Sequence, residues 1–543
     1  MAWARAARLA SHGLWLASMQ PGFTRFARAL HDPDAAQRAL LERHLRAEAD
    51  TAWGRRHGYA AIRDLAAFQD RVPVSTYDDL ADDVRRAASG EQRVLTAEPV
   101  RFFERSSGSS SASKLIPYTD GLKAQFAAAT DPWLASLHHR FGGVVGGRAY
   151  WSISPVARAP ERTPGGHAIG IEDDAEYLSP FAQALMGRLL AVPREVAREP
   201  DVDRWRVATL RHLLAAEDLS LLSIWSPSFL TVLMRALEAR WDSIVGALPR
   251  ARRARLDAAV RARGLVGEAL WPRLRVLSCW TDAAARAAVA GLRAYFPTIP
   301  IEPKGLLATE GAVSLPFLDQ RVDAAVEDPE LGPLVPSVRP LAVASHVIEL
   351  LPADDPDARP VAPSRLDVGA RYVPLLTTAG GFVRYRLGDE VECTGYLRRA
   401  PTIAFVGKRD AVSDLCGEKL HASHAQVALD AARAMTGARL RFATLVPLAG
   451  PARYALLVDA RDEGAGLAAL RAEVEARLAD NPHYAYARRL GQLGPLELRV
   501  VADAEAYYLA AKMAAGMRAG DVKATPLDPR WIEPPARPLE ETT

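Results

Sequence analysis

Apolar runs of strand length recur through the first 406 residues, and helical patterns lie between several of them. The runs cover residues 148–153, 273–280, 342–350, 371–376 and 402–406. Strands that alternate with helices favour parallel pairing, because a parallel connection must cross the sheet and usually does so as a helix. The sequence therefore predicts an α/β fold, with helix-covered and mostly parallel sheets in a large N-terminal domain over residues 1–406.

A different pattern follows the segment 407–411. Helices are expected near residues 422–435, 467–478 and 504–517, and strands at 439–446, 454–458 and 496–501. This compact mixture of about 130 residues has the usual size of a domain. It predicts a small, separate C-terminal α+β domain over residues 412–543.

The first hundred residues have helical patterns. A Pro-Asp-Ala sequence at residue 33 begins a patterned run to Glu48, and residues 75–79 resemble a helix start with an acidic first turn. The extreme N-terminus has a short apolar run, residues 14–17, which is too poor to be the core of a signal peptide. We expect an amphipathic helix that packs on the body of the domain, with a helix on a membrane surface as the alternative.

Charge and cysteine content exclude several classes of protein. The 543 residues include 68 lysines and arginines and 65 acidic residues, so a formal net charge of +3 gives no global field to gather nucleic acid or anionic lipid. Three scattered cysteines suit neither a disulfide framework nor a zinc site. No stretch reaches the roughly 20 apolar residues of a spanning helix. We expect a cytoplasmic protein that binds no nucleic acid and has no integral membrane insertion.

One loop has the composition of a phosphate-binding site. Residues 106–114 read Ser-Ser-Gly-Ser-Ser-Ser-Ala-Ser-Lys. Hydroxyl and backbone N–H groups around a central glycine can donate to phosphate oxygens, and Lys114 adds a positive charge. The spacing is not that of a Walker A loop, which argues against a kinase or a P-loop NTPase. A flexible serine linker is the alternative, and the ordered flanking segments argue against it.

Two more clusters lie near the ends of expected strands, where ligands of open α/β sheets bind. In the segment 305–311, Glu310 could hold Mg²⁺ together with phosphate oxygens, although a glutamate in a turn is more often a solvated loop residue. In the segment 382–389, Asp389 follows a strand and a glycine turn and could accept hydrogen bonds from ribose hydroxyls. In isolation, an aspartate that stabilises a hairpin turn explains that segment equally well.

The order of these motifs along the chain is more specific than any one of them. The motifs are FQDRVPVSTYDD at 68–79, the serine-glycine loop with KLIPYT at 114–119, ATEG at 308–311, YRLGD at 385–389, FVGKRD at 405–410, GEKL at 417–420 and the late Lys523. With them the chain resembles the Gretchen Hagen type, auxin-responsive acyl acid amido synthetases, as a bacterial-type member of the adenylate-forming superfamily. That superfamily includes acyl-CoA synthetases, adenylation domains and luciferases, and the resemblance covers nearly the whole chain.

The resemblance implies a role for each matching residue in the large domain. The phosphate-binding motif is matched by Ser106, Ser107, Gly108, Ser109, Ser110 and Lys114. Thr309 and Glu310 match the motif that contacts the nucleotide and Mg²⁺, and Asp389 matches the ribose-binding aspartate. Ala112 stands where related loops carry glycine, which would limit the flexibility of the loop without removing its phosphate contacts.

The resemblance also implies a mobile small domain. Arg409 and Asp410 match a hinge, residues 407–411, about which that domain would rotate. Lys523 corresponds best to the lysine that approaches the reacting carboxylate and the α-phosphate. Gly520-Asp521 stands where the family typically has Gly-Gln, just before this lysine.

The implied activity is ATP-dependent activation of a carboxylic acid as an acyl-adenylate, followed by transfer to an amine or amino acid with formation of an amide. Carboxylate and ATP are both anions, so Lys114, Mg²⁺ and Lys523 would offset their repulsion. ATP and Mg²⁺ are the expected cofactors, and a monomer acting on small molecules is the expected state. An acyl-CoA ligase is the alternative, and a catalytically inactive nucleotide-binding protein is less favoured. The sequence names neither the acid nor the amine.

Several other residues have simpler explanations. The adjacent His138 and His139 lack further ligands at metal-site spacing, so a surface or partly buried helix pair is expected. His346 and Glu349 are assigned no catalytic role. Three tryptophans fit the core better than a pocket wall, because buried aromatic residues are more often core. They are Trp151, Trp225 and Trp280.

Overall fold

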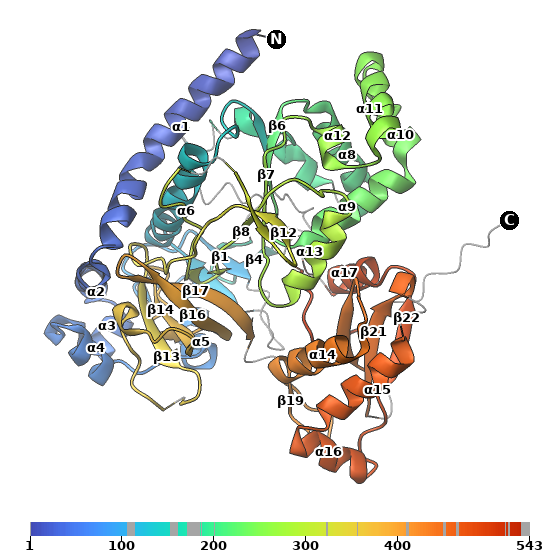
Figure 1. The fold of residues 1–543 in the computed structure, drawn as a ribbon. Coiled ribbons are helices and arrows are strands. Elements are labelled where there is room, and N and C mark those ends of the chain that lie inside the picture. The colour runs from blue at the N-terminus through green and yellow to red at the C-terminus, as the bar shows by residue number, and fades with distance from the viewer. Residues whose placement is uncertain are drawn as a thin grey trace. The chain divides into compact units, whose positions relative to one another are not determined.

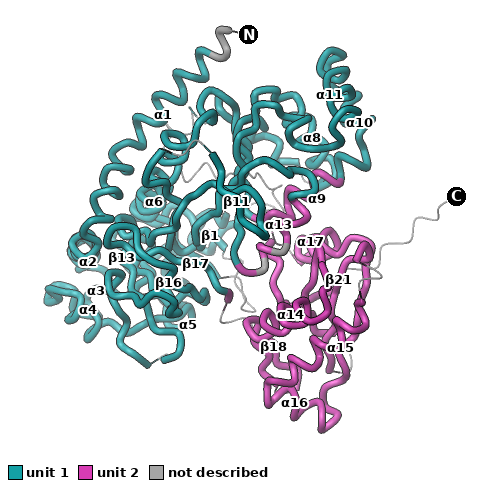
Figure 2. The backbone as a smooth tube through the Cα atoms, in the orientation of Figure 1, with its two compact units in different colours: residues 1–225, 236–282, 293–406 teal, residues 226–235, 283–292, 407–543 magenta. Residues whose placement is uncertain are grey.

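The computed structural model describes most of the chain and divides into two compact units (Figure 2). The described residues are 2–105, 114–151, 161–170, 185, 187–199, 201–321, 324–355, 357–408, 412–416, 418–448, 452–462, 466–515, 517, 519 and 522–533. Unit 1 consists of Met1–Trp225, Ala236–Asp282 and Arg293–Val406. Unit 2 consists of Ser226–Arg235, Ala283–Leu292 and Gly407–Thr543. None of the described helices is both long enough and apolar enough to cross a bilayer.

Helix α1, Ala2–Ala29, packs along α6, Asp120–Arg140, in unit 1 (Figure 1). Trp15 and Phe26 of α1 are buried there, which confirms the expected helix packed on the domain body. Of the histidine pair on α6, His138 is buried and His139 is exposed. Burial lowers the pKa of His138 to about 4, so this side chain is neutral at physiological pH.

The other N-terminal helices begin where the sequence signals predict. Helix α2, Pro33–Glu48, has proline in its first turn, and the carboxylate of Asp32 accepts from the N–H of Ala35 at 3.0 Å. Helix α5, Tyr77–Ala88, begins with a capping box in which the backbone N–H of Thr76 donates to Asp79 at 2.7 Å. Shorter helices lie between them, α3 at Ala52–Arg56 and α4 at Leu65–Arg71.

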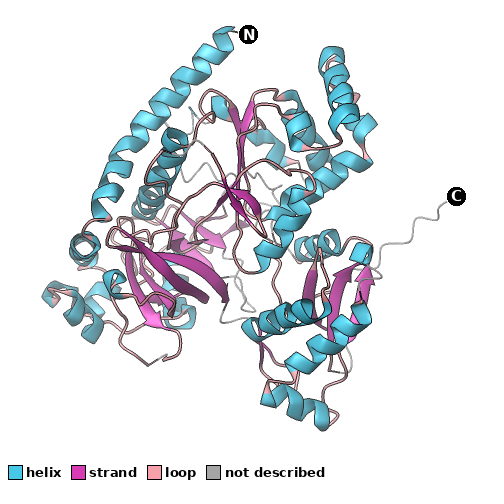
Figure 3. Ribbon diagram, in the orientation of Figure 1, coloured by secondary structure: helices cyan, strands magenta, loops and turns pink. Residues whose placement is uncertain are grey.

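A six-stranded sheet, here called the central sheet, is the largest among the described residues. Figure 3 marks the strands in magenta and the helices in cyan. Its order is β11 (Val326–Asp328), β12 (Gly332–Leu334), β8 (Ile301–Pro303), β7 (Val276–Cys279), β6 (Leu219–Ser223) and β3 (Arg148–Trp151). All neighbouring pairs except β11 with β12 are parallel. Strands β6 and β7 are buried along their whole length, as parallel strands covered on both faces usually are. The mostly parallel sheet predicted from the sequence is therefore confirmed.

Six of the described helices lie between the strands of the central sheet in chain order, and most of α9 and α13 belongs to unit 2. They are α8 (Val202–Ala215), α9 (Pro227–Ala239), α10 (Trp241–Val245), α11 (Arg250–Arg263), α12 (Gly267–Leu270) and α13 (Ala284–Arg293).

Two further sheets of unit 1 carry the segments with motifs. The first is ordered β2 (Leu115–Tyr118), β1 (Phe102–Arg105), β5 (Ala168–Ile169) and β4 (Glu161–Arg162). The second is ordered β13 (Val347–Pro352), β14 (Arg371–Thr377), β16 (Asp389–Leu397) and β17 (Ala400–Lys408), and β15 (Tyr385–Arg386) pairs with β14. The expected strand 342–350 begins only at Val347, because residues 342–345 form a turn in which the Ser345 N–H donates to the Ala342 carbonyl at 2.9 Å.

Unit 2 contains a small sheet with its own apolar core. Its described strands are ordered β20 (Ala443–Pro447), β21 (Tyr454–Asp459) and β22 (Glu497–Val501), and β18 (Val412–Ser413) pairs separately with β19 (Leu420–His421). The helices are α14 (Ala422–Thr436), α15 (Leu467–Leu478), α16 (Pro482–Arg489) and α17 (Ala504–Ala514). Leu456, Leu470 and Val474 are buried between strands and helices.

An ion pair attaches the segment Ser226–Arg235 to the rest of unit 2. The guanidinium of Arg235 lies 2.6 Å from a carboxylate oxygen of Asp503 and 3.4 Å from one of Glu505. Burial raises the pKa of Glu505 to about 7, and the positive charge of Arg235 opposes that rise.

A buried ion pair stabilises the antiparallel sheet of unit 1. Arg384 and Glu349 have side chains that are 3% and 1% exposed, and they form two hydrogen bonds of 3.0 Å. The same guanidinium donates to the backbone carbonyls of Gln69 and Val72. Arg384 also has a left-handed backbone, with φ of 44°, immediately before β15. Its side-chain contacts therefore position the YRLGD segment that follows.

We expect Glu349→Ala to lower the free energy of unfolding by about 3–5 kcal/mol, because it leaves a buried guanidinium without its counter-charge. Urea denaturation followed by tryptophan fluorescence measures the change. Asp82→Ala is the matched control, because Asp82 pairs with Arg85 on the surface, where both side chains are more than two-thirds exposed. That loss is expected to stay below about 1 kcal/mol. Equal losses in the two variants would contradict the role given to the buried pair.

Candidate active site

The serine-glycine loop lies between the two strands of an antiparallel hairpin. Strand β1 pairs with β2, with Phe102 opposite Tyr118 and Arg105 opposite Leu115. Five of the expected phosphate-binding residues lie outside the described residues: Ser106, Ser107, Gly108, Ser109 and Ser110. Ala112, Arg409, Asp410, Gly520 and Asp521 also lie outside them. Lys114 is the first described residue after the loop, so the hairpin fixes where the loop begins and ends.

Lys114 connects this hairpin to the YRLGD segment. Its ammonium donates to the hydroxyl of Tyr385 at 3.3 Å, and it lies 5.6 Å from the ring centroid of Tyr77 and 6.0 Å from that of Tyr385. The hydroxyl of Tyr77 accepts from the N–H of Leu115 at 2.9 Å, and burial raises the pKa of Tyr77. Two tyrosines from separate segments therefore hold the lysine, one by a hydrogen bond and both by their π faces.

Tyr118 connects the same hairpin to the ATEG segment. Its ring is buried and stacks on Phe102 and Phe126, with centroid distances of 4.8 and 6.0 Å. Its hydroxyl donates to the carbonyl of Thr309 at 2.6 Å. This stacking restricts the Tyr118 ring. Its hydrogen bond therefore positions the backbone of Thr309 relative to strand β2.

Thr309 and Glu310 form the turn of a two-strand hairpin, β9 (Leu307–Ala308) and β10 (Gly311–Ala312). Glu310 is buried, with 8% of its surface exposed. Among the described residues, no group of three or more His, Cys, Asp or Glu side chains has the spacing of a metal site. Mg²⁺ that is held by one carboxylate and by phosphate oxygens needs no such group, so a single buried carboxylate is compatible with it.

Gly311 lies against a buried histidine. A Cβ atom at this position would stand 2.9 Å from Nε2 of His346 and 3.0 Å from Cδ1 of Leu376. Nδ1 of His346 lies 2.8 Å from the Ser345 hydroxyl, whereas Nε2 has no hydrogen-bond partner among the described residues. Burial lowers the pKa of His346 to about 3, so the ring is neutral. A neutral, tightly packed ring fits the structural role expected for His346.

Asp389 is buried at the start of β16, directly after the strand that carries Tyr385. Tyr385 pairs with Leu376 of β14 and forms a bridge with Ser75 of the FQDRVPVSTYDD segment. Since Leu376 also lies beside Gly311, the YRLGD and ATEG segments contact the same strand. The described contacts thus join three distant segments of unit 1: the flank of the serine-glycine loop, ATEG and YRLGD.

Lys523 lies in unit 2, after α17. Its side chain is half-buried, and its backbone carbonyl accepts from the hydroxyl of Tyr508 at 3.5 Å. The Tyr508 ring stacks on Trp531 with a centroid distance of 5.8 Å. Lys523 therefore lies on a segment that is attached to the core of its own unit.

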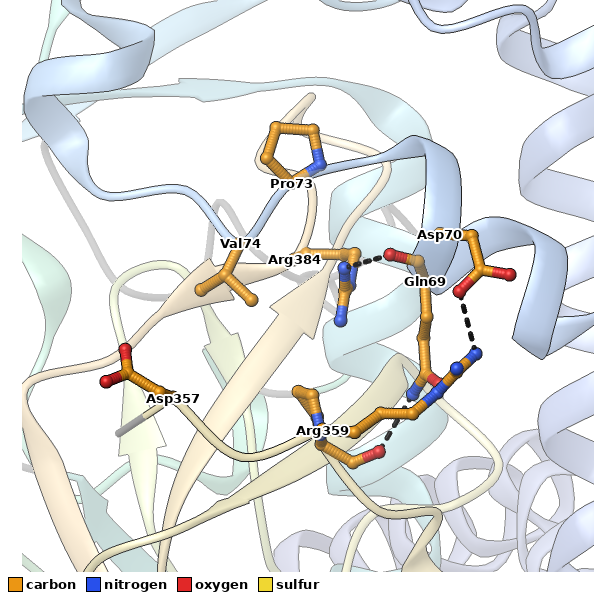
Figure 4. Close-up of a pocket in the computed structure, with 8 residues that line it drawn as sticks. Gln69, Asp70, Pro73, Val74, Asp357, Arg359 and Arg384 are labelled. Atoms are coloured by element: carbon orange, nitrogen blue, oxygen red, sulfur yellow. Dashed lines mark hydrogen bonds and ion pairs between the residues drawn. The ribbon is translucent and has the colours of Figure 1, made fainter. Parts of the chain in front are cut away.

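A depression on the surface of unit 1 lies elsewhere. It has a volume of about 390 Å³ and is lined by Gln69, Asp70, Pro73, Val74, Asp357, Arg359, Pro360 and Arg384 (Figure 4). In it, Arg359 forms a 3.1 Å ion pair with Asp70, and Arg384 donates to the carbonyl of Gln69. None of the residues expected to bind nucleotide lines this depression. Arg359 is paired with Asp70 and Arg384 with the buried Glu349, so we do not assign this depression to the nucleotide.

Comparison with protein families identifies the chain. Residues 22–301 match the GH3 family N-terminal domain, residues 340–408 the GH3 family central domain and residues 423–527 the GH3 family C-terminal domain. The chain belongs to the GH3 family. The sequence resemblance to auxin-responsive acyl acid amido synthetases is confirmed at that level.

Curated relatives of this GH3 chain come from plants. A probable indole-3-acetic acid-amido synthetase, GH3.12 of Oryza sativa subsp. japonica, is 26% identical over 94% of this chain and 93% of the relative. The indole-3-acetic acid-amido synthetase GH3.10 of Arabidopsis thaliana is 25% identical over 80% of this chain and 81% of the relative.

Solved structures confirm the fold class of this GH3 chain. The AtGH3.15 acyl acid amido synthetase in complex with 2,4-DB matches with a TM-score of 0.77 and 18% identity, over 94% of both chains. A second structure of the GH3.15 enzyme matches with a TM-score of 0.74, also at 18% identity, over 93% of this chain and 92% of that one. The predicted α/β fold is therefore confirmed.

Sequence reasoning missed one group of residues in this GH3 chain. Lys304 follows β8 and is buried between the indoles of Trp133 and Trp225. Trp151, Trp225 and Trp280 are half-buried rather than fully in the core, which corrects the core assignment. Lys304, Trp133 and Trp225 lie far apart in the chain, so no local pattern groups them. The one signal in the sequence is a lysine directly after an apolar strand.

We expect Gly311→Ala to lower the free energy of unfolding by about 1–3 kcal/mol and to weaken ATP binding, because its methyl group would push on His346 and displace the adjoining Glu310. Denaturation and nucleotide titration measure the two effects. In a His346→Ala background the cost of Gly311→Ala is expected to shrink, since the ring that clashes is gone. A cost that is the same in both backgrounds would rule out this contact as the cause.

Proposed function

We propose that this GH3 chain uses ATP to activate a carboxylic acid as an acyl-adenylate and then transfers the acyl group to an amine or amino acid, forming an amide. The observation that carries the proposal is the joining of three motif segments by two contacts, Lys114 to Tyr385 and Tyr118 to Thr309. The plant relatives, which are named amido synthetases for indole-3-acetic acid, support the same reaction class.

In unit 1, each segment has a separate task toward the nucleotide. The N–H and hydroxyl groups of Ser106–Ser110 would donate to phosphate oxygens, with Lys114 adding charge at the edge of that loop. Thr309 would contact the nucleotide beside Glu310, and Asp389 would accept from the ribose hydroxyls. The rigid contacts of Lys114 and Tyr118 support this assignment, because preorganised donors stabilise developing charge without reorganisation.

Glu310 is the residue that would hold Mg²⁺. When bound there, the ion would screen the phosphate charges that repel the incoming carboxylate. The burial of Glu310 supports this assignment, since a carboxylate excluded from water attracts a cation more strongly than a solvated one.

Lys523 is proposed as the lysine that approaches the α-phosphate during adenylation. We infer a large domain over residues 1–406 and a small one over 412–543, with rotation about residues 407–411 that includes Arg409. Such a rotation would close the site over the adenylate and exclude water until the amine arrives. The separate apolar core of unit 2 supports a domain that moves as one body.

We also infer the setting in which this activity operates. The protein would be a cytoplasmic monomer of bacterial type, acting on small molecules without nucleic-acid partners or insertion into a membrane. A formal net charge of only +3 supports the lack of a nucleic-acid partner, because it gives no global field to gather a polyanion.

Purified protein with ATP and Mg²⁺ is expected to exchange labelled pyrophosphate into ATP when a suitable acid is present, because adenylation is reversible before AMP leaves. Mass spectrometry after addition of mixed amino acids or coenzyme A then distinguishes an amide from a thioester. An amide product supports the proposal. A thioester as the only product would favour the acyl-CoA ligase, and the absence of exchange over a broad acid panel would favour a catalytically inactive protein.

We expect Lys523→Ala to reduce pyrophosphate exchange by roughly 100-fold or more, since one charge-stabilising donor contributes about that much to the rate. The dissociation constant of ATP should change little, because most nucleotide contacts come from unit 1. Lys123→Ala is the control: Lys123 pairs with Asp120 at the surface of α6, and its loss should change neither quantity. Equal losses of exchange and of ATP affinity in the Lys523 variant would contradict the proposed role.

A further inference from the structure

A buried polar cluster lies at the carboxyl ends of the parallel strands in the central sheet. Ser223 ends β6, Cys279 ends β7 and Lys304 follows β8 directly. In open α/β sheets this edge is where ligands bind. The segments proposed to bind the nucleotide lie at other strands, namely β2, β9 and β15. The ends of β6, β7 and β8 therefore have no assigned ligand.

Lys304 is the centre of the cluster. Only 4% of its surface is exposed, and its ammonium donates to the Ser223 hydroxyl at 2.8 Å. The same atom lies 4.3 Å from the ring centroid of Trp133 and 4.7 Å from that of Trp225. Burial lowers the pKa of Lys304 to about 8, so the side chain is still mostly charged at pH 7. A charged ammonium is thus enclosed by two indole faces and one hydroxyl.

Glu302 is the nearest acidic neighbour along the chain, but it does not form an ion pair with Lys304. Its carboxylate accepts from Nε1 of Trp133 at 2.9 Å and from the hydroxyl of Ser278 at 2.7 Å. Burial raises the pKa of Glu302. Among the described residues, no carboxylate lies within ion-pair distance of Lys304. The ammonium interacts with the Glu302 carboxylate only by Coulomb attraction at a longer distance.

This arrangement leaves the ammonium short of oxygen partners. An ammonium has three N–H donors, and the Ser223 hydroxyl is its single oxygen acceptor among the described residues. Two cation–π contacts offset only part of the cost of burying a charge. An added acceptor of negative or partial negative charge would therefore bind here with a large gain.

Four indoles lie in and around this cluster: Trp133 is buried, and Trp151, Trp225 and Trp280 are half-buried. Trp225 and Trp280 face each other with a centroid distance of 5.3 Å, and Trp133 and Trp151 with one of 6.3 Å. Walls of this kind suit the apolar body of an organic acid, whereas polyphosphate needs several donors and water. The cluster thus combines an apolar wall with one buried cation, which is typical of a small-molecule pocket.

We infer that Lys304 is a specificity-determining residue of the acyl pocket, and that it selects acids whose body carries an oxygen acceptor, a hydroxyl, oxo or second carboxylate group, away from the reacting carboxylate. This inference rests on the proposed adenylation of a carboxylic acid and names the class of acid. The acceptor would take the place of the missing oxygen partner of the ammonium, while the indoles contact the ring or chain of the acid.

The test compares pairs of acids that differ only by one oxygen substituent, such as phenylacetate with 4-hydroxyphenylacetate and hexanoate with adipate. Pyrophosphate exchange gives kcat/KM for each acid with the full-length protein. We expect the wild type to prefer the oxygenated member of at least one pair. Lys304→Met should reduce that preference by roughly 10- to 100-fold, the usual effect of a hydrogen bond to a charged group, and change kcat/KM for the plain member by less than about threefold.

Three further measurements keep the test decisive. Lys123→Met is the matched control, because it makes the same substitution at a lysine of α6 that pairs with Asp120, and it should leave the preference unchanged. Lys304→Gln, which keeps a donor without the charge, replaces the methionine variant if that variant does not fold. Tryptophan fluorescence during acid titration reports binding without turnover, and the oxygenated acid should bind the wild type more tightly than the Lys304 variants.

Two results would overturn the inference while leaving adenylation intact. One is a wild type that prefers the plain acid in every pair. The other is an equal loss for both members of a pair in the Lys304 variants, which would show that Lys304 only supports the fold. Absence of exchange with every acid would instead overturn the proposed function, and this inference with it.

Discussion

The candidate site depends on one hydrogen bond, from the buried hydroxyl of Tyr118 to the carbonyl of Thr309. A hydrogen bond of this kind contributes about 0.5–1.5 kcal/mol to stability. Lys114 lies directly before the same strand, β2, and contacts Tyr385. A single hairpin therefore sets the positions of two motif segments that are distant in the sequence. The serine-glycine loop connects the strands of that hairpin, so its ends are fixed relative to both.

The polar groups around this hairpin are held in an apolar framework. The parallel strands β6 and β7 are buried along their whole length. Lys304 lies at the carboxyl end of this sheet, and the pair of Arg384 and Glu349 lies in the antiparallel sheet of β13 to β17. Arg384 and Glu349 satisfy each other, and the backbone carbonyls around them accept the remaining guanidinium donors. Lys304 differs, because indoles and one hydroxyl surround it without a paired carboxylate among the described residues. Polar groups that are left incompletely satisfied in this way are where ligand selectivity is expected to arise.

The sequence predicted elements whose signals are local. Helix α2 was predicted from Pro33 to Glu48 because the Pro-Asp-Ala sequence marks its start, and apolar runs identified β7 and β14. It could not predict features that depend on tertiary packing. The segment Ser226–Arg235 belongs to unit 2, and Arg235 forms an ion pair with Asp503 there. No local sequence pattern indicates this contact. The enclosure of Lys304 likewise needs side chains from three distant segments.

A crystal structure with a non-hydrolysable acyl-adenylate analogue tests the central claim most directly, because it locates the ribose, the phosphate position and the acyl group together. The account predicts the ribose hydroxyls at Asp389, the phosphate position between the serine-glycine loop and Thr309–Glu310, and the acyl group toward the carboxyl edge of the central sheet. An analogue bound instead in the depression lined by Asp70 and Arg359, away from all three motif segments, would contradict it.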